Sequence, residues 1–198
     1  MSDIMDMITS QLSGEAMKQI SRQLGTNEQQ SSSANAAALP VLLGAMNKNA
    51  KTSEGASALA GALEKDHDGS ILDNLGGFLG NASQGPGAGI LGHVLGGQRG
   101  KVEQYVSKTS GLNTQGSGQL LEMLAPVVMG ALGKQKREQG LDAGALAGML
   151  GNVMSNRQSQ APQQNQILGA LLDSDGDGDI TDDIVNLGGK LLGGLFKR

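Results

Sequence analysis

Six of the nineteen acidic residues of this 198-residue chain lie close together, in the stretch 173–183. They are Asp173, Asp175, Asp177, Asp179, Asp182 and Asp183. The first four alternate with other residues, and Gly178 and Ile180 supply a turn and an aliphatic anchor. Hard cations such as Ca²⁺ bind carboxylate and carbonyl oxygens that a tight loop of this kind turns inward. The stretch therefore predicts a metal site with Ca²⁺ as its cofactor.

A twelve-residue calcium loop has side-chain ligands at positions one, three and five and a backbone carbonyl ligand at position seven. These positions fall on Asp173, Asp175, Asp177 and Asp179. The twelfth position, where such loops carry a bidentate glutamate, is Ile184. Asp182 or Asp183 would have to close the site instead, directly or through water. Because the bidentate ligand is missing, the spacing leaves the affinity open.

A simpler interpretation of the same stretch is a turn followed by a helix. Asp179 or Thr181 could cap that helix, and Asp182 and Asp183 would then lie favourably near the positive end of its dipole. A cap needs one or two acidic residues, and six acids without a cation would repel one another. The sequence therefore favours calcium over a capped turn.

A second acidic stretch, 64–74, follows the same pattern 109 residues earlier. The matching residues are Glu64, Asp66, Asp68, Gly69, Ile71 and Asp73. Glu64 replaces the first aspartate, and Ser70 with Asp73 fits a capping box. We expect this loop to be a degenerate copy that turns and caps the chain rather than binding an ion.

The elements that must position these loops are predicted to be helices, because apolar residues recur at helical spacing and no alternating strand pattern is present. Residues 24–48 match residues 110–134 at a constant spacing of 86 residues, and 58–63 match 145–150 at a spacing of 87. The expected fold is all-α, with two duplicated helical units, 1–98 and 99–198, packed through glycine-rich faces. A polar linker, 155–166, precedes the second acidic loop.

Composition excludes several functional classes. The net charge of −4 and the absence of a basic, aromatic-interleaved stripe argue against nucleic acid as a partner. Without cysteine there is no disulfide or thiolate metal site. The acidic N-terminus is unlike a signal peptide, and no apolar run reaches the ~18 residues of a membrane span. We expect a cytoplasmic location.

Neither histidine suggests catalysis. His93 lies in a glycine-rich apolar string, where a packing role is expected, and His67 lies at a non-ligand position of the loop 64–74. No serine, histidine and aspartate constellation can be recognised, so an enzyme is not expected. Residues 184–198 form an apolar segment with a basic end, which predicts a docking helix more than a helix that contacts a membrane surface.

Three strings carry a resemblance to a known family: KDHDGS at 65–70, GILGH at 89–93 and LAP at 124–126. With the closing acidic loop, the chain resembles the bacterial domain-of-unknown-function family 937, the YidB-like helical proteins. The stretch 173–183 separately resembles EF-hand and dockerin calcium loops. The first resemblance implies a bacterial helical protein without an assigned activity. Together with the loop, it predicts a non-enzymatic calcium-binding protein; the alternative is a calcium-independent module for protein interaction or self-assembly.

Overall fold

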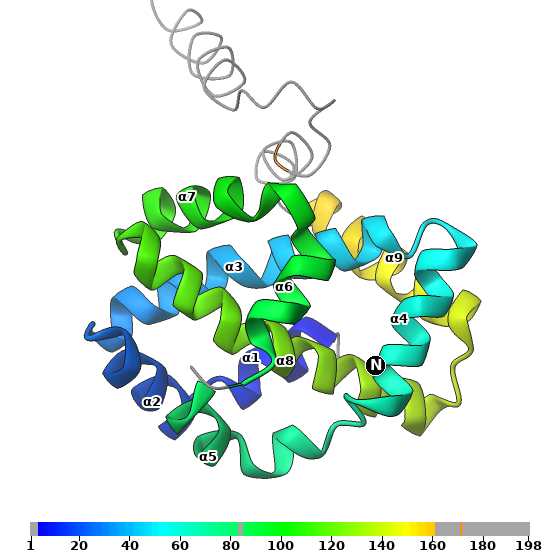
Figure 1. Ribbon diagram of the computed structural model, residues 1–198, viewed down its shortest axis with the longest axis horizontal. Helices are drawn as coiled ribbons and strands as arrows, with labels where there is room; N and C mark the ends of the chain where they lie inside the picture. The colour runs from blue at the N-terminus through cyan, green and yellow to red at the C-terminus, as the bar shows by residue number, and fades with distance from the viewer. Residues whose placement is uncertain (1–3, 83–84, 161–170, 172–198) are drawn as a thin grey trace, which may run out of the picture.

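The computed structural model describes residues 4–82, 85–160 and 171, and every regular element in these ranges is helical (Figure 1). The prediction of an all-α fold is confirmed. The α-helices are α1 (Ile4–Gln11), α2 (Glu15–Leu24), α3 (Glu28–Asn49), α4 (Ser53–Lys65), α5 (Leu75–Gly80), α6 (Gly87–Leu95), α7 (Arg99–Ser110), α8 (Thr114–Gln139) and α9 (Ala143–Gln160). The 3₁₀ helices η1 (Ser70–Asn74) and η3 (Gly96–Gln98) lead into α5 and α7.

The two long helices α3 and α8 form the centre of the fold (Figure 1). Every residue in 37–46 of α3 and in 123–133 of α8 is buried. A helix that is apolar on all sides has to be covered on all sides. α3 packs against α7, α8 and α9, and α8 also contacts α1, α4, α6 and α7. The other helices thus surround this central pair.

Both central helices continue through an internal proline, Pro40 in α3 and Pro126 in α8. Proline has no N–H, so the carbonyl four residues earlier loses its helical donor. For Pro126 that carbonyl belongs to Glu122. The first residue of α6, Gly87, lies so close to it that an added Cβ would overlap the Glu122 carbonyl oxygen. The positive end of the α6 dipole therefore faces the oxygen that Pro126 leaves without its helical donor.

The starts of the two central helices are fixed in the same way. Asn27 and Asn113 are the N-cap residues, and their side chains accept hydrogen bonds from the backbone N–H of Gln30 and Gly116, at 2.8 and 2.7 Å. The preceding helices, α2 and α7, each end at a left-handed glycine. An asparagine cap of this type contributes about 1 kcal/mol. Both helices therefore begin at sharply defined residues.

The serine-rich start of α3 is helical, although serine is a weak helix former in solution. Ser31 is fully buried, and its hydroxyl lies within hydrogen-bond distance of the hydroxyls of Ser21 and Thr26. Tertiary contacts therefore compensate for the low propensity. A break at Ser13 and Gly14 separates α1 from α2.

Buried residues from both sides of residue 98 belong to one hydrophobic core. Its members include Ile8, Leu42 and Leu63 as well as Leu120 and Leu146. α9 continues to Gln160, so the first part of the stretch predicted as a linker is helical. Among the described residues, no helix is long and apolar enough to span a membrane.

We predict opposite effects for two alanine substitutions in α6. Gly87→Ala should lower the free energy of unfolding by about 1–3 kcal/mol, because its Cβ would collide with the Glu122 backbone and force α6 away from α8. Gly89→Ala, which meets no atom within 4 Å, should leave the stability unchanged or raise it by up to about 1 kcal/mol. Urea unfolding curves measure both; equal effects would contradict the close contact between α6 and α8.

Candidate functional site

The first acidic loop, 64–74, lies against α8. Gly69 has a positive φ of 98°, and a Cβ there would come within 2.7 Å of Lys134 Cβ. On α8, a Cβ added to Gly130 would overlap the Ile71 side chain, and one added to Gly133 would overlap the carbonyl oxygen of His67. The two α8 glycines, one turn apart, form what we call the glycine seat. The loop approaches α8 closely because side chains are missing there.

Two of the four carboxylates of this loop have partners within the protein. Asp68 Oδ1 accepts a hydrogen bond from the Ser70 N–H at 3.0 Å, and Asp68 Oδ2 lies 3.7 Å from Arg137 Nη1. Glu64 Oε2 lies 3.4 Å from Lys136 Nζ. α8 therefore supplies cations to two of the loop carboxylates. Within the described ranges, no group of three or more acidic or histidine side chains is arranged to hold a metal.

The capping box predicted for Ser70 and Asp73 is not formed. Gly69 is the N-cap of η1 and has no side chain that could cap it. Asp68 bonds the Ser70 N–H instead, in an Asx turn that orders the entry to η1. Asn74 caps the next helix, α5, by accepting from the Gly77 N–H at 3.2 Å. The loop turns and caps the chain, as the sequence indicates, but through different residues.

The hydrogen bond from the Ser70 backbone lowers the pKa of Asp68 below its ordinary value of 3.8. The Ser70 hydroxyl and the charge of Arg137 act in the same direction. A carboxylate whose pKa is lower in the folded than in the unfolded state stabilises the fold at pH values above its unfolded-state pKa. That stabilisation is lost as the pH falls through the folded-state pKa. The Asx turn should therefore persist at neutral pH and open in acid.

The predicted calcium ligands, Asp173, Asp175, Asp177, Asp179, Asp182 and Asp183, lie outside the described residues. Ile184 and the predicted C-terminal helix lie outside them as well. The described residue nearest to this stretch is Leu171, which is 2% exposed and belongs to the hydrophobic core. The acidic stretch thus begins two positions after a residue anchored in the core.

The two histidines lie in different environments, and His93 differs from expectation. His93 is exposed rather than packed, and its Nδ1 lies 2.8 Å from the carbonyl oxygen of Gly89 in the same helix. The apolar string around it turns Leu91 and Leu95 inward and leaves His93 on the opposite face. His67 is partly buried, and burial lowers its pKa, partly offset by Asp66. Its lowered pKa makes the neutral form of His67 more dominant at pH 7.

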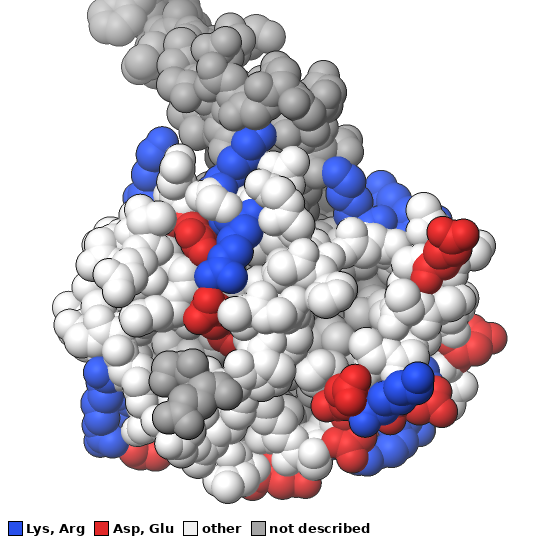
Figure 2. Space-filling view, viewed as in Figure 1, with Lys and Arg blue, Asp and Glu red and all other residues white. Residues whose placement is uncertain are grey.

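A group of three charges that the sequence did not single out joins α7 to α8. Arg99 Nε donates to Glu103 Oε1 at 2.7 Å, and Arg99 Nη2 donates to Glu122 Oε1 at 2.6 Å. Both hydrogen bonds raise the pKa of Arg99, and the bond to Glu103 has the larger effect. The pairing of Arg99 with Glu103 is visible as an i,i+4 spacing, but Glu122 comes from another helix. Figure 2 shows a face on which charges are sparse and gather in small mixed groups of this kind.

Comparison with known proteins gives one match. The model of the family DUF937, described as bacterial protein of unknown function, matches residues 6–135. This span contains the loop 64–74, the glycine seat and the Arg99 group, whereas the stretch 173–183 lies beyond it. No curated protein and no solved structure matches the chain.

We predict that the pKa of Asp68, followed by NMR through its carboxyl carbon, lies below 3.8. Ser70→Pro removes the donating N–H and should move the pKa of Asp68 towards the ordinary value. Ser70→Ala keeps that N–H and should move it less. A larger shift in the alanine variant than in the proline variant would contradict the assignment of the Ser70 backbone as the main cause.

Proposed function

Because the chain belongs to the DUF937 family of bacterial proteins of unknown function, we propose a function from its own residues: it is a non-enzymatic helical protein that binds one Ca²⁺ ion through the loop 173–183. The proposed ligands are Asp173, Asp175 and Asp177 through their side chains, Asp179 through its carbonyl, and Asp182 or Asp183 as the closing carboxylate. One observation carries the proposal, namely the contrast between this loop and the described loop of the same pattern.

In the loop 64–74, the fold itself balances two of the four acidic side chains. Glu64 pairs with Lys136, and Asp68 is held by a backbone N–H and by Arg137. The positions that match Lys136 and Arg137 at the 86-residue spacing are Ala50 and Lys51, which directly follow the end of α3. The stretch 173–183 carries more carboxylates, while the two positions after α3 offer one cation fewer than Lys136 and Arg137 do. A divalent cation would supply the missing positive charge.

The buried position of Leu171 supports a link between ion binding and fold stability. Its side chain is 2% exposed in the core, two positions before Asp173. An ion that binds only the native loop stabilises the fold by mass action, by about 2.7 kcal/mol at a hundredfold excess over its dissociation constant. Calcium should therefore raise the melting temperature of the whole chain.

We also infer that the two halves are copies of one helical unit. The glycines that end α2 and α7, Gly25 and Gly111, stand 86 residues apart, as do the N-caps Asn27 and Asn113. The internal prolines Pro40 and Pro126 have the same spacing. Together with the 109-residue spacing of the two acidic stretches, these pairs support the proposal that the loops 64–74 and 173–183 are counterparts. Their matched residues provide the controls for the calcium experiment.

Calorimetric titration of Ca²⁺ into the chelator-treated full chain tests the proposal. We expect heat that saturates at one equivalent, together with a rise in melting temperature. Asp177→Asn should weaken binding at least about tenfold, because it removes a charged ligand at position five. The matched control is Asp68→Asn, since Asp68 holds the same place in the other loop, and it should bind as the wild type does.

Absence of heat with the wild type would show that the loop 173–183 is a turn. If both variants lost binding equally, the ion could not be assigned to the loop 173–183, which would contradict the proposal. Light scattering of the same samples distinguishes the alternative function: self-association that is indifferent to Ca²⁺ and to Asp177→Asn would identify a calcium-independent assembly module instead.

A further inference from the structure

A buried amide in the contact between α2 and α3 lacks an adequate partner. Asn35 of α3 is 5% exposed, and its Nδ2 contacts the sulfur of Met17 at 3.9 Å. Within the part of the chain that the structure describes, Asn35 Oδ1 accepts no hydrogen bond. Sulfur in a thioether is a weak acceptor, and a buried amide is costly when its hydrogen bonds are weak or unmade. Turning the amide over would place Oδ1 beside the Met17 sulfur, which has no hydrogen to donate, so this orientation makes no hydrogen bond to Met17 either.

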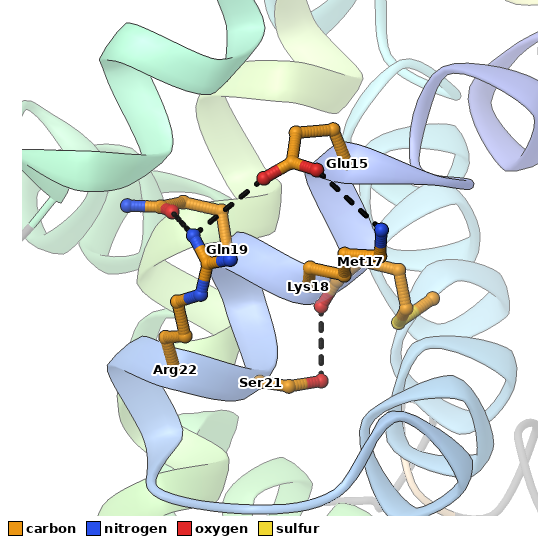
Figure 3. A network of polar contacts seen from close by, with 6 residues as sticks. All are labelled: Glu15, Met17, Lys18, Gln19, Ser21 and Arg22. Atoms are coloured by element: carbon orange, nitrogen blue, oxygen red, sulfur yellow. Dashed lines mark hydrogen bonds and ion pairs between the residues drawn. The ribbon is translucent and has the colours of Figure 1, made fainter.

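Met17 is placed so that an oxidant can reach it while its sulfur stays near the amide. Its side chain is partly exposed, unlike that of Asn35. Figure 3 shows the Met17 side chain extending away from Gln19 and Arg22, which lie on the other side of α2. Glu15 contacts Lys18 and Arg22 at 3.7 and 3.5 Å. Met17 therefore belongs to the side of α2 that packs on α3.

The geometry between Met17 and Asn35 is fixed by a chain of hydroxyl groups one turn away. Ser21 Oγ lies 2.9 Å from the Met17 carbonyl oxygen and 2.9 Å from Ser31 Oγ. Ser31 Oγ in turn lies 2.8 Å from Thr26 Oγ1. Ser21 and Ser31 are buried, so these contacts are shielded from water. They hold α2 and α3 together next to the contact between sulfur and amide.

We propose that Met17 is a site of reversible oxidation whose sulfoxide oxygen accepts a hydrogen bond from Asn35 Nδ2. The oxidant is hydrogen peroxide. The sulfur lone pair attacks one peroxide oxygen, the O–O bond breaks, an S–O bond forms, and the proton on the transferred oxygen passes to the leaving hydroxide, so that sulfoxide and water result. The sulfur is oxidised and the peroxide is reduced. Methionine sulfoxide reductases reverse such a change.

The oxygen of the sulfoxide is a stronger hydrogen-bond acceptor than the thioether sulfur. It would lie beside Asn35 Nδ2, which contacts that sulfur in the reduced protein. For the majority of partly exposed methionines, oxidation puts a polar group against apolar surface and weakens the fold. Met149 and Met154 of α9 are of that kind, since both pack against the hydrophobic core. Met17 differs because Asn35 faces its sulfur. Oxidation at Met17 should therefore leave the α2–α3 contact intact or tighten it.

The test uses the full chain, hydrogen peroxide, and mass spectrometry that measures sulfoxide at each methionine. The diagnostic variant is Asn35→Leu, because Leu121 occupies the matching position of α8 and is fully buried there. Met17→Leu, in each background, subtracts the effect of the other methionines. We expect Met17 oxidation to lower the melting temperature by at least about 2–4 °C more in Asn35→Leu than in the wild type.

Equal shifts in the two backgrounds would overturn the proposal, and so would a Met17 that stays reduced while Met149 and Met154 are oxidised. If Asn35→Leu does not fold, the wild type alone decides the matter through the NMR signals of the Asn35 side-chain amide. We expect them to shift and their hydrogen exchange to slow when Met17 is oxidised. Unchanged signals with Met17 fully oxidised would refute the hydrogen bond.

Discussion

The fold depends on two elements, the loop 64–74 and the start of α6, that pack closely against α8. The loop can approach because α8 has glycines there in place of larger side chains. The start of α6 can approach because a proline of α8 leaves a carbonyl without its helical donor. The glycine seat at Gly130 and Gly133 admits the loop 64–74, and Pro126 leaves the carbonyl of Glu122 to face the start of α6. Aromatic residues are rare in this chain, so bulk cannot fill gaps between helices. Tight backbone contact replaces large side chains as the means of burying α8.

The helical spacing of apolar residues predicted the all-α class of the fold. Proline, asparagine and glycine mark the ends and the middles of α3 and α8, because caps and left-handed turns depend on residues close in the chain. Contacts between distant elements could not be predicted in this way. The pairing of Arg99 with Glu122 and the helical state of Ser31 require knowledge of which helices meet. The exposure of His93 depended on which face of α6 turns towards α8.

In the acidic loops, too, some features follow from the local sequence and others depend on contacts with distant helices. Spacing alone indicated that the loop 64–74 is a turn, and the structure adds that Arg137 and Lys136 of α8 pair with two of its four carboxylates. The side chain that orders the start of η1 could not be predicted. Gly69, with its positive φ, stands at the N-cap position, and Asp68 rather than Ser70 supplies the side-chain hydrogen bond. For the loop 173–183, the six aspartates carry the calcium proposal, and Leu171, two positions before Asp173, is buried in the core.

The claim that one loop binds an ion and its counterpart does not can be tested within a single sample. Ca²⁺ is titrated into the ¹⁵N-labelled full chain while the backbone amides of Gly178 and Gly69, the matching glycines of the two loops, are observed together. We predict that the Gly178 signal moves and saturates at one equivalent of Ca²⁺ while the Gly69 signal stays in place. A Gly178 signal that does not respond, or equal responses of the two glycines, would contradict the division of roles between the loops.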